Sequence, residues 1–280
     1  MNTVITKKEY QALKENGLNF QEVAKKYLTD TELKEINFLE TLNFKPEEGG
    51  SFANFGSFAY WKNSTHKKAF DQANENIQLL QDWDKIQEEN VELKAGYVLL
   101  GVNAGAKGMG IKGIETFEHF EMFQIRSLKQ NNKSIPVKSP IRYKNALINT
   151  RNEAFYNEVV SGTYMTDFIK GLPTPYGPDI KKNLKKIKAN LKYSDVKFKK
   201  FYSNFCKLFG EILNTELQLL GGKTHTLIVM GKNPKTCIVN EFLKESGLDQ
   251  QYNVVNISHY SGSPKQVDLV EELKNAYSIK

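Results

Sequence analysis

The sequence is poor in the residues that build metal centres and disulfide frameworks. Its 280 residues include two cysteines, Cys206 and Cys237, and four histidines. Two cysteines are too few for a disulfide framework or for a zinc or iron–sulfur ligand set, and the histidines are too far apart along the chain to form a recognisable metal motif. We therefore expect no metal and no other cofactor.

Long apolar runs are missing as well. No stretch approaches the roughly 20 apolar residues that are needed to cross a bilayer, and the first residues, MNTVITKKEYQALKENG, are too charged for a signal peptide. We expect a cytoplasmic monomer without membrane contact. The 40% of hydrophobic residues are enough for a sizeable core.

Arginine is scarce too. Only three of the 39 basic residues are Arg, so the net charge of +7 comes from lysine. Lysine contacts phosphates as a point charge and reads bases poorly. The pI near 9.1 suits a partner that carries phosphates, but a lysine-rich surface that is merely solvated explains it equally well.

The first 94 residues form a predicted helical extension, because apolar residues recur there every three or four positions. The segments with this pattern are residues 6–16, 19–28, 30–42 and, as one long helix, 65–92. Between them, residues 49–64 (GGSFANFGSFAYWKNS) alternate aromatic with small polar residues. These aromatic rings either stack on nucleic-acid bases or pack beneath the helices, which is the more frequent role.

Residues 95–280 alternate apolar runs typical of buried strands with helical patterns. The strands are expected at 97–102, 162–171, 225–231 and 252–262, and the helices at 115–131, 178–192, 195–220, 234–247 and 264–278. This alternation predicts an α/β fold, a three-layer αβα sandwich with a four-stranded, mostly parallel sheet.

Notable residues, most of them polar, stand late in or just after each expected strand. Ligands bind at the carboxyl ends of the strands in parallel sheets, so we expect these residues to face one crevice. They are Asn103, Asp167 with Lys170, Gly231 with Asn233, and His259.

The glycine-rich turn after the first of these strands matches neither common phosphate-binding loop. A P-loop needs Lys followed by Ser or Thr, but Lys107 is followed by Gly108. The dinucleotide-binding fingerprint needs glycine where Asn103 stands. Neither a nucleoside triphosphate nor a dinucleotide is therefore indicated.

Two strand ends, GVNAG at 101–105 and SHYSG at 258–262, resemble the first and last motifs of the uracil-DNA glycosylase superfamily. The first is similar above all to that of the mismatch-specific uracil- and thymine-DNA glycosylases. Residues 164–171 (YMTDFIKG) and 227–231 (LIVMG) resemble the family's two middle strands. The resemblance spans 95–280 in the family's order of elements. The chain departs from the family pattern at three positions, Ala104 and Tyr260 for Pro and Asp167 for Asn.

The resemblance implies a metal-free, monofunctional DNA glycosylase that hydrolyses the N-glycosidic bond of a damaged or deaminated base flipped out of DNA. Asn103 would hold the hydrolytic water, and His259 would donate a hydrogen bond to the departing base. The implied substrate-binding residues are Gly101, Val102, Ala104, Gly105, Asp167 and Ser261. The implied DNA contacts are Tyr260, Gly262, Lys107 and Lys170.

Asp167 bears on which base is bound. An ionised carboxylate only accepts hydrogen bonds, so it favours a base edge with an amino group or adjacent donors, as on cytosine or a guanine-like or xanthine-like base, over uracil. Alternatively, Asp167 caps a turn or pairs with Lys170.

Other functions remain open. The chain could be a non-catalytic nucleic-acid-binding or protein-binding protein that keeps the glycosylase fold, or a hydrolase or transferase of free nucleosides. Lys107 and Lys170 leave a lysine nucleophile possible. The loop at 134–153 and the lysine run at 181–192 either contact phosphates, with strong salt dependence, or are an ordinary connection and a solvated helix face.

Overall fold

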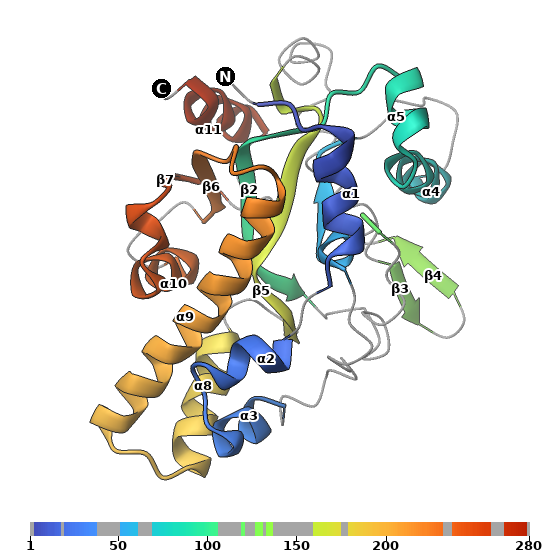
Figure 1. Cartoon of the computed structure of the whole chain (residues 1–280). Coiled ribbons are helices and arrows are strands. Elements are labelled where there is room, and N and C mark those ends of the chain that lie inside the picture. Colours follow the sequence, from blue (N-terminus) through green and yellow to red (C-terminus); the bar gives the residue numbers. More distant parts are fainter. Residues whose placement is uncertain are drawn as a thin grey trace.

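A computed structural model shows that the chain has an α/β fold (Figure 1). It describes residues 3–17, 20–37, 51–60, 69–105, 119–120, 127–130, 133–136, 159–174, 179–231, 237–258 and 266–278.

The main sheet has five strands in the order β1-β5-β2-β6-β7. Their bounds are β1 Gly56–Phe58, β2 Lys94–Gly105, β5 Thr163–Thr174, β6 Thr226–Met230 and β7 Asn253–Ile257. The last four are parallel neighbours and coincide with the four apolar runs of the sequence. β1 pairs antiparallel with β5 and makes the sheet mixed and five-stranded, where four strands were expected.

A separate two-stranded sheet joins β3 (Ser127–Gln130) to β4 (Lys133–Pro136). The helix expected over 115–131 is wrong at this end, because four residues are too few for apolar spacing to separate a helix from a strand. β4 also contains the start of the expected phosphate-contacting loop at 134–153, most of which lies outside the described residues.

The helices of the first 94 residues follow the predicted pattern with one break. Their bounds are α1 Lys7–Glu15, α2 Phe20–Lys25, α3 Asp30–Asn37, η2 Phe52–Asn54 (a 3-10 turn), α4 Ala69–Leu80 and α5 Trp83–Glu88. α1 begins at a capping box in which Thr6 and Glu9 satisfy each other's main-chain N–H groups. The expected helix at 65–92 is divided because the Asp82 carboxylate accepts from two main-chain N–H groups and starts α5.

The remaining helices agree closely with the sequence pattern. They are α8 Asp179–Asn190, α9 Asp195–Leu219, α10 Ile238–Ser246 and α11 Gln266–Ser278, with the 3-10 turn η5 at Leu248–Gln250. In the described part of the chain, no helix is both long and apolar enough to cross a membrane.

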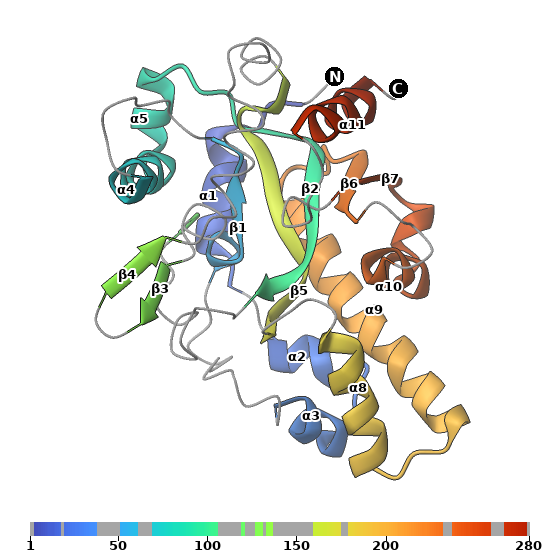
Figure 2. The same ribbon diagram turned by 180° about the vertical axis from the view of Figure 1, so that it is seen from behind.

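Helices contact the two faces of β5, whose side chains alternate between them. On one face, Tyr164 and Thr166 bond to Glu216 of α9, and Phe168 stacks on α10. On the other face, the Tyr277 hydroxyl of α11 donates to Thr163 Oγ1 at 2.9 Å. Figures 1 and 2 show α9 crossing the sheet on the same side as α10. α11 lies near the end of the sheet at which β2 and β5 start (Figures 1 and 2).

The aromatic segment at 49–64 is part of the hydrophobic core. Phe52, Phe55 and Phe58 are 2%, 3% and 0% exposed, and Phe58 packs edge-on against Tyr164 of β5. The packing interpretation is therefore confirmed for these three rings, and the base-stacking interpretation is wrong for them. Through this contact the first 94 residues share one core with the α/β part.

Candidate functional site

The carboxyl ends of β2, β5, β6 and β7 lie at one edge of the sheet, because these strands are parallel. β2 and β5 remain paired up to Gly105 and Thr174. At the neighbouring strands, the Gly231 N–H donates to the Ile257 carbonyl oxygen at 2.8 Å, which joins the exits of β6 and β7. This edge is where the sequence places the site.

Gly101 and Asp167 are directly opposite each other in the β2–β5 register. A Cβ atom at Gly101 would lie 2.1 Å from Asp167 Oδ1 and 3.3 Å from the end of Met230. Real Cβ atoms do not approach an oxygen so closely, so the glycine makes room for the carboxylate. Asp167 is 2% exposed, which places a buried acidic group beside the GVNAG motif.

Asn103 continues β2 two residues beyond Gly101, and its main chain pairs with Ile169 of β5. Ala104 and Gly105 complete the strand. Val102 is half-buried and packs against the hydrophobic core, so its side chain is a structural contact here. The backbone of the first motif and Asp167 are therefore brought together within the β2–β5 pair, four residues before β2 ends and seven residues before β5 ends.

The other predicted site residues have no described position. They are Lys107, His259, Tyr260, Ser261 and Gly262. The residue before them, Ser258, is held by α11, because its N–H and its hydroxyl donate to the Glu272 carboxylate at 2.5 and 3.0 Å. Glu272 thus fixes the point from which the last motif starts.

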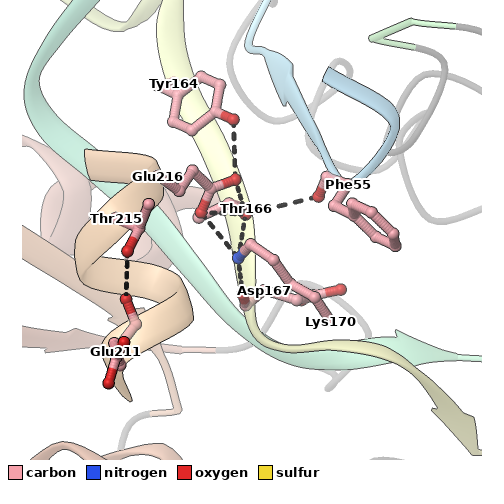
Figure 3. Close-up of polar contacts among 8 residues, drawn as sticks. All are labelled: Phe55, Tyr164, Thr166, Asp167, Lys170, Glu211, Thr215 and Glu216. Carbon is pink, nitrogen blue, oxygen red and sulfur yellow. Dashed lines mark hydrogen bonds and ion pairs between the residues drawn. The ribbon is translucent and has the colours of Figure 1, made fainter. Parts of the chain in front are cut away.

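Lys170 is enclosed in a buried cluster on α9's side of β5 (Figure 3). Its ammonium nitrogen lies 2.7 Å from Glu216 Oε2, and both side chains are 0% exposed. It also donates to Thr166 Oγ1 at 3.0 Å and to the main-chain carbonyl of Asp167 at 2.6 Å. An ammonium group with these partners is not on a surface that DNA can reach, so we no longer expect Lys170 to contact a phosphate or act as a nucleophile.

Glu216 completes this cluster, and the sequence analysis did not identify it. Its carboxylate also accepts from the Tyr164 hydroxyl at 3.0 Å and from Thr166. Burial raises the pKa of Glu216, while the ammonium of Lys170 and the two hydroxyls oppose that rise. The pKa of Tyr164 is also raised, first by burial and then by Glu216.

A signal for Glu216 exists in the sequence. It lies at helical spacing among Ile212, Leu213, Leu217 and Leu220, all of which are buried. A carboxylate inside an apolar helix stripe is costly without a cation, so it indicates a buried lysine or arginine on a neighbouring element. Lys170 of β5 is that cation.

The contact between Lys170 and Asp167 differs from the pairing considered in the sequence analysis. The ammonium group binds the main-chain oxygen of Asp167, not its carboxylate, and the carboxylate lies over Gly101. The buried cluster therefore holds the main chain of β5 at Asp167, whose carboxylate lies over Gly101. In this way Lys170 and Glu216 position Asp167 through its main-chain oxygen.

Within the described residues, no group of three or more His, Cys, Asp or Glu side chains is placed to hold a metal ion. Comparisons with protein-family models, curated proteins and solved structures gave no match for this chain. The resemblance to the glycosylases therefore rests on the short sequence motifs alone.

Proposed function

We propose that the protein is a monofunctional DNA-base glycosylase of the uracil-DNA glycosylase superfamily, acting on DNA as a cytoplasmic monomer with a three-layer αβα domain. The observation that carries the proposal is the close contact of Gly101 with Asp167, which joins the GVNAG motif to the YMTDFIKG segment beside Met230, the last residue of β6. In parallel sheets ligands bind beyond the carboxyl ends of the strands. A flipped base bound here would meet the Asp167 carboxylate, which accepts hydrogen bonds from the edge of the base, next to the strand that carries Asn103.

The chemistry needs a positioned water and a stabilised leaving base. Asn103 holds the water through its amide oxygen, and His259 donates to the oxygen on which negative charge accumulates. An amide is a weak base, so a modest rate is expected unless the leaving group is good. No metal takes part in this scheme.

Asp167 sets the base preference. A carboxylate offers acceptors only, so it pairs with an exocyclic amino group or adjacent ring donors and repels the carbonyl of uracil. Its burial strengthens this selection, because an unmatched polar group costs more away from water. Cytosine-like and guanine-like or xanthine-like bases are therefore favoured substrates.

The test is excision from labelled single- and double-stranded oligonucleotides that carry uracil, hypoxanthine, xanthine, cytosine or a mismatched thymine, with alkaline cleavage of the abasic sites. Removing the water-holding group in Asn103→Ala should lower the rate about 100-fold or more. His259→Ala should lower it similarly, since one donor to a developing anion is worth about 100–1,000-fold. Asp167→Asn should move the preference towards uracil.

A second candidate is a non-catalytic protein that binds nucleic acid or a protein partner. It is favoured by the burial of Lys170, which the resemblance implies as a DNA contact and which is unavailable to DNA. Under this alternative the wild type retains DNA but excises no base, and Asn103→Ala changes neither property. That result would overturn the glycosylase proposal.

A further inference from the structure

The positive charge of the protein is concentrated in one segment. Residues 179–200, which comprise α8, its connection and the start of α9, contain nine lysines and two aspartates. Their net charge of +7 equals that of the whole chain, so the other residues contain acids and bases in equal number. We call residues 179–200 the basic hairpin.

Helix α8 presents most of its lysines to solvent and its large apolar side chains to the protein, whereas Val196 at the start of α9 is 80% exposed. Ile180, Leu184 and Ile187 of α8 are 1–2% exposed. The exposed lysines are Lys181, Lys182, Lys185, Lys186, Lys192, Lys197, Lys199 and Lys200. Along α8 they occupy the helix face opposite the buried residues.

Some of these charges are already matched within the protein. Lys181 pairs with Glu241 at 2.6 Å, and Lys188 pairs with Asp195. Among the described residues, Lys182, Lys185 and Lys186 have no ion pair. Three adjacent positive charges on one helix repel one another, and an anionic partner relieves that repulsion.

Helix α3 is hydrogen-bonded to the end of α8 and to the connection that follows it. Asn190 donates to Glu35 Oε2 and the Tyr193 hydroxyl donates to Glu32 Oε1, both at 3.0 Å. Burial and the bond to Glu32 raise the pKa of Tyr193, so its hydroxyl stays protonated as a donor. These contacts fix which side of α8 faces outward.

The hairpin lies beyond the carboxyl ends of the two strands that carry the proposed site (Figures 1 and 2). α8 starts at Asp179, shortly after β5 ends at Thr174, and both ribbon views show α8 and the start of α9 extending beyond the carboxyl ends of β2 and β5 (Figures 1 and 2). The 12 residues of α8 span about 18 Å, the length of about five nucleotides of one DNA strand.

We propose that the basic hairpin binds the phosphate backbone of the DNA that flanks the base at the strand-end site. This inference rests on the proposed function for the identity of its ligand. Lysines contact phosphates without reading sequence, as a general damage-searching surface requires. A membrane surface fits less well, because interfacial helices insert apolar residues, and those of α8 are buried.

The test compares two triple variants that remove equal charge. Lys182→Gln, Lys185→Gln and Lys186→Gln change the hairpin, while Lys8→Gln, Lys85→Gln and Lys244→Gln change exposed lysines on α1, α5 and α10. Binding of a fluorescent 30-base-pair duplex is measured by anisotropy between 50 and 200 mM salt. The hairpin variant should bind about 10-fold or more weakly, with a log–log salt slope smaller by about 2–3, and the control should stay within about twofold of wild type.

Equal losses in the two variants would assign the effect to total charge and overturn the proposal, as would unchanged binding in both. Loss of binding to phosphatidylserine vesicles with DNA binding intact would assign the hairpin to a membrane and also overturn it. Excision assays on the same proteins separate the two proposals. If DNA binding depends on the hairpin but no base is excised, the present inference holds and the glycosylase proposal is overturned. If bases are excised and the hairpin variant binds DNA normally, the glycosylase proposal holds and the present inference is overturned.

Discussion

Asp167 and Lys170 are three residues apart on one strand, yet their charged groups lie on opposite sides of it. Lys170 lies inside the protein, where Glu216 of α9 neutralises its charge. The Asp167 carboxylate lies over Gly101 of β2, beside Met230 at the end of β6. The difference shows that a charged residue in a buried strand either forms an ion pair in the core, as Lys170 does, or lies at the candidate site, as Asp167 does. The alternation of side chains along the strand decides which of these two positions each residue takes. Changes on each side of β5 should therefore have separable effects.

The largest effect is expected on the Lys170 side. Glu216→Ala leaves a buried ammonium without its counter-ion and should lower the free energy of unfolding by about 3–5 kcal/mol. The double variant Lys170→Met with Glu216→Leu removes both charges and should lose much less. Urea unfolding of Glu216→Ala, of the single variants Lys170→Met and Glu216→Leu, and of their double variant measures this. Additive losses would show that the two residues do not act as a pair.

An intermediate effect is expected on the Asp167 side. Gly101→Ala places a methyl group against the carboxylate and should cost about 1–3 kcal/mol of stability, together with loss of excision. Gly247→Ala is the matched control, because its φ of +80° strains any other residue but nothing lies within 4 Å of the new atom. Gly247→Ala should lower stability and leave the activity per folded molecule unchanged. Equal activity losses in the two variants would contradict a site at Gly101.

The smallest effect is a pH dependence that separates two glutamates of α9. Hydrogen bonds from Lys26 and Tyr27 lower the pKa of Glu211. The stability that Glu211 contributes is therefore complete above its unfolded pKa of about 4.3 and disappears as the pH falls through the lower folded value. The pKa of Glu216 is raised, so its contribution instead weakens as the pH rises through the raised value. Thermal unfolding from pH 3 to 7 should show Glu211→Gln losing less stability than wild type on acidification, by less than about 1 kcal/mol.

Most of the fold could be predicted from local sequence patterns, and each error in the predicted elements has a local cause. The four parallel strands are continuous apolar runs, which the sequence shows directly. β1 was missed because Gly56, Ser57 and Phe58 form a strand only by pairing with β5. The long helix at 65–92 was predicted unbroken because its apolar spacing continues across Asp82, where a side-chain cap divides it.

The candidate site is less accessible to sequence reasoning. The order of the apolar runs was enough to predict that Gly101, Asn103 and Asp167 lie on strands of one parallel sheet, but β2 and β5 continue beyond all three residues. The direction of the Lys170 side chain could not be predicted, because it depends on which face of β5 is covered by α9. Its partner Glu216 is 46 residues further along the chain, and only tertiary packing joins the two.

The pairing of β1 with β5 has a consequence for the early part of the chain. Without residues 56–58, β5 would become an exposed strand edge with unpaired main-chain groups next to a strongly apolar sheet. Such an edge is a template for intermolecular strand addition. The first 94 residues therefore act as a built-in protection against aggregation, and a chain that begins at residue 95 should precipitate even where its own sheet is able to form.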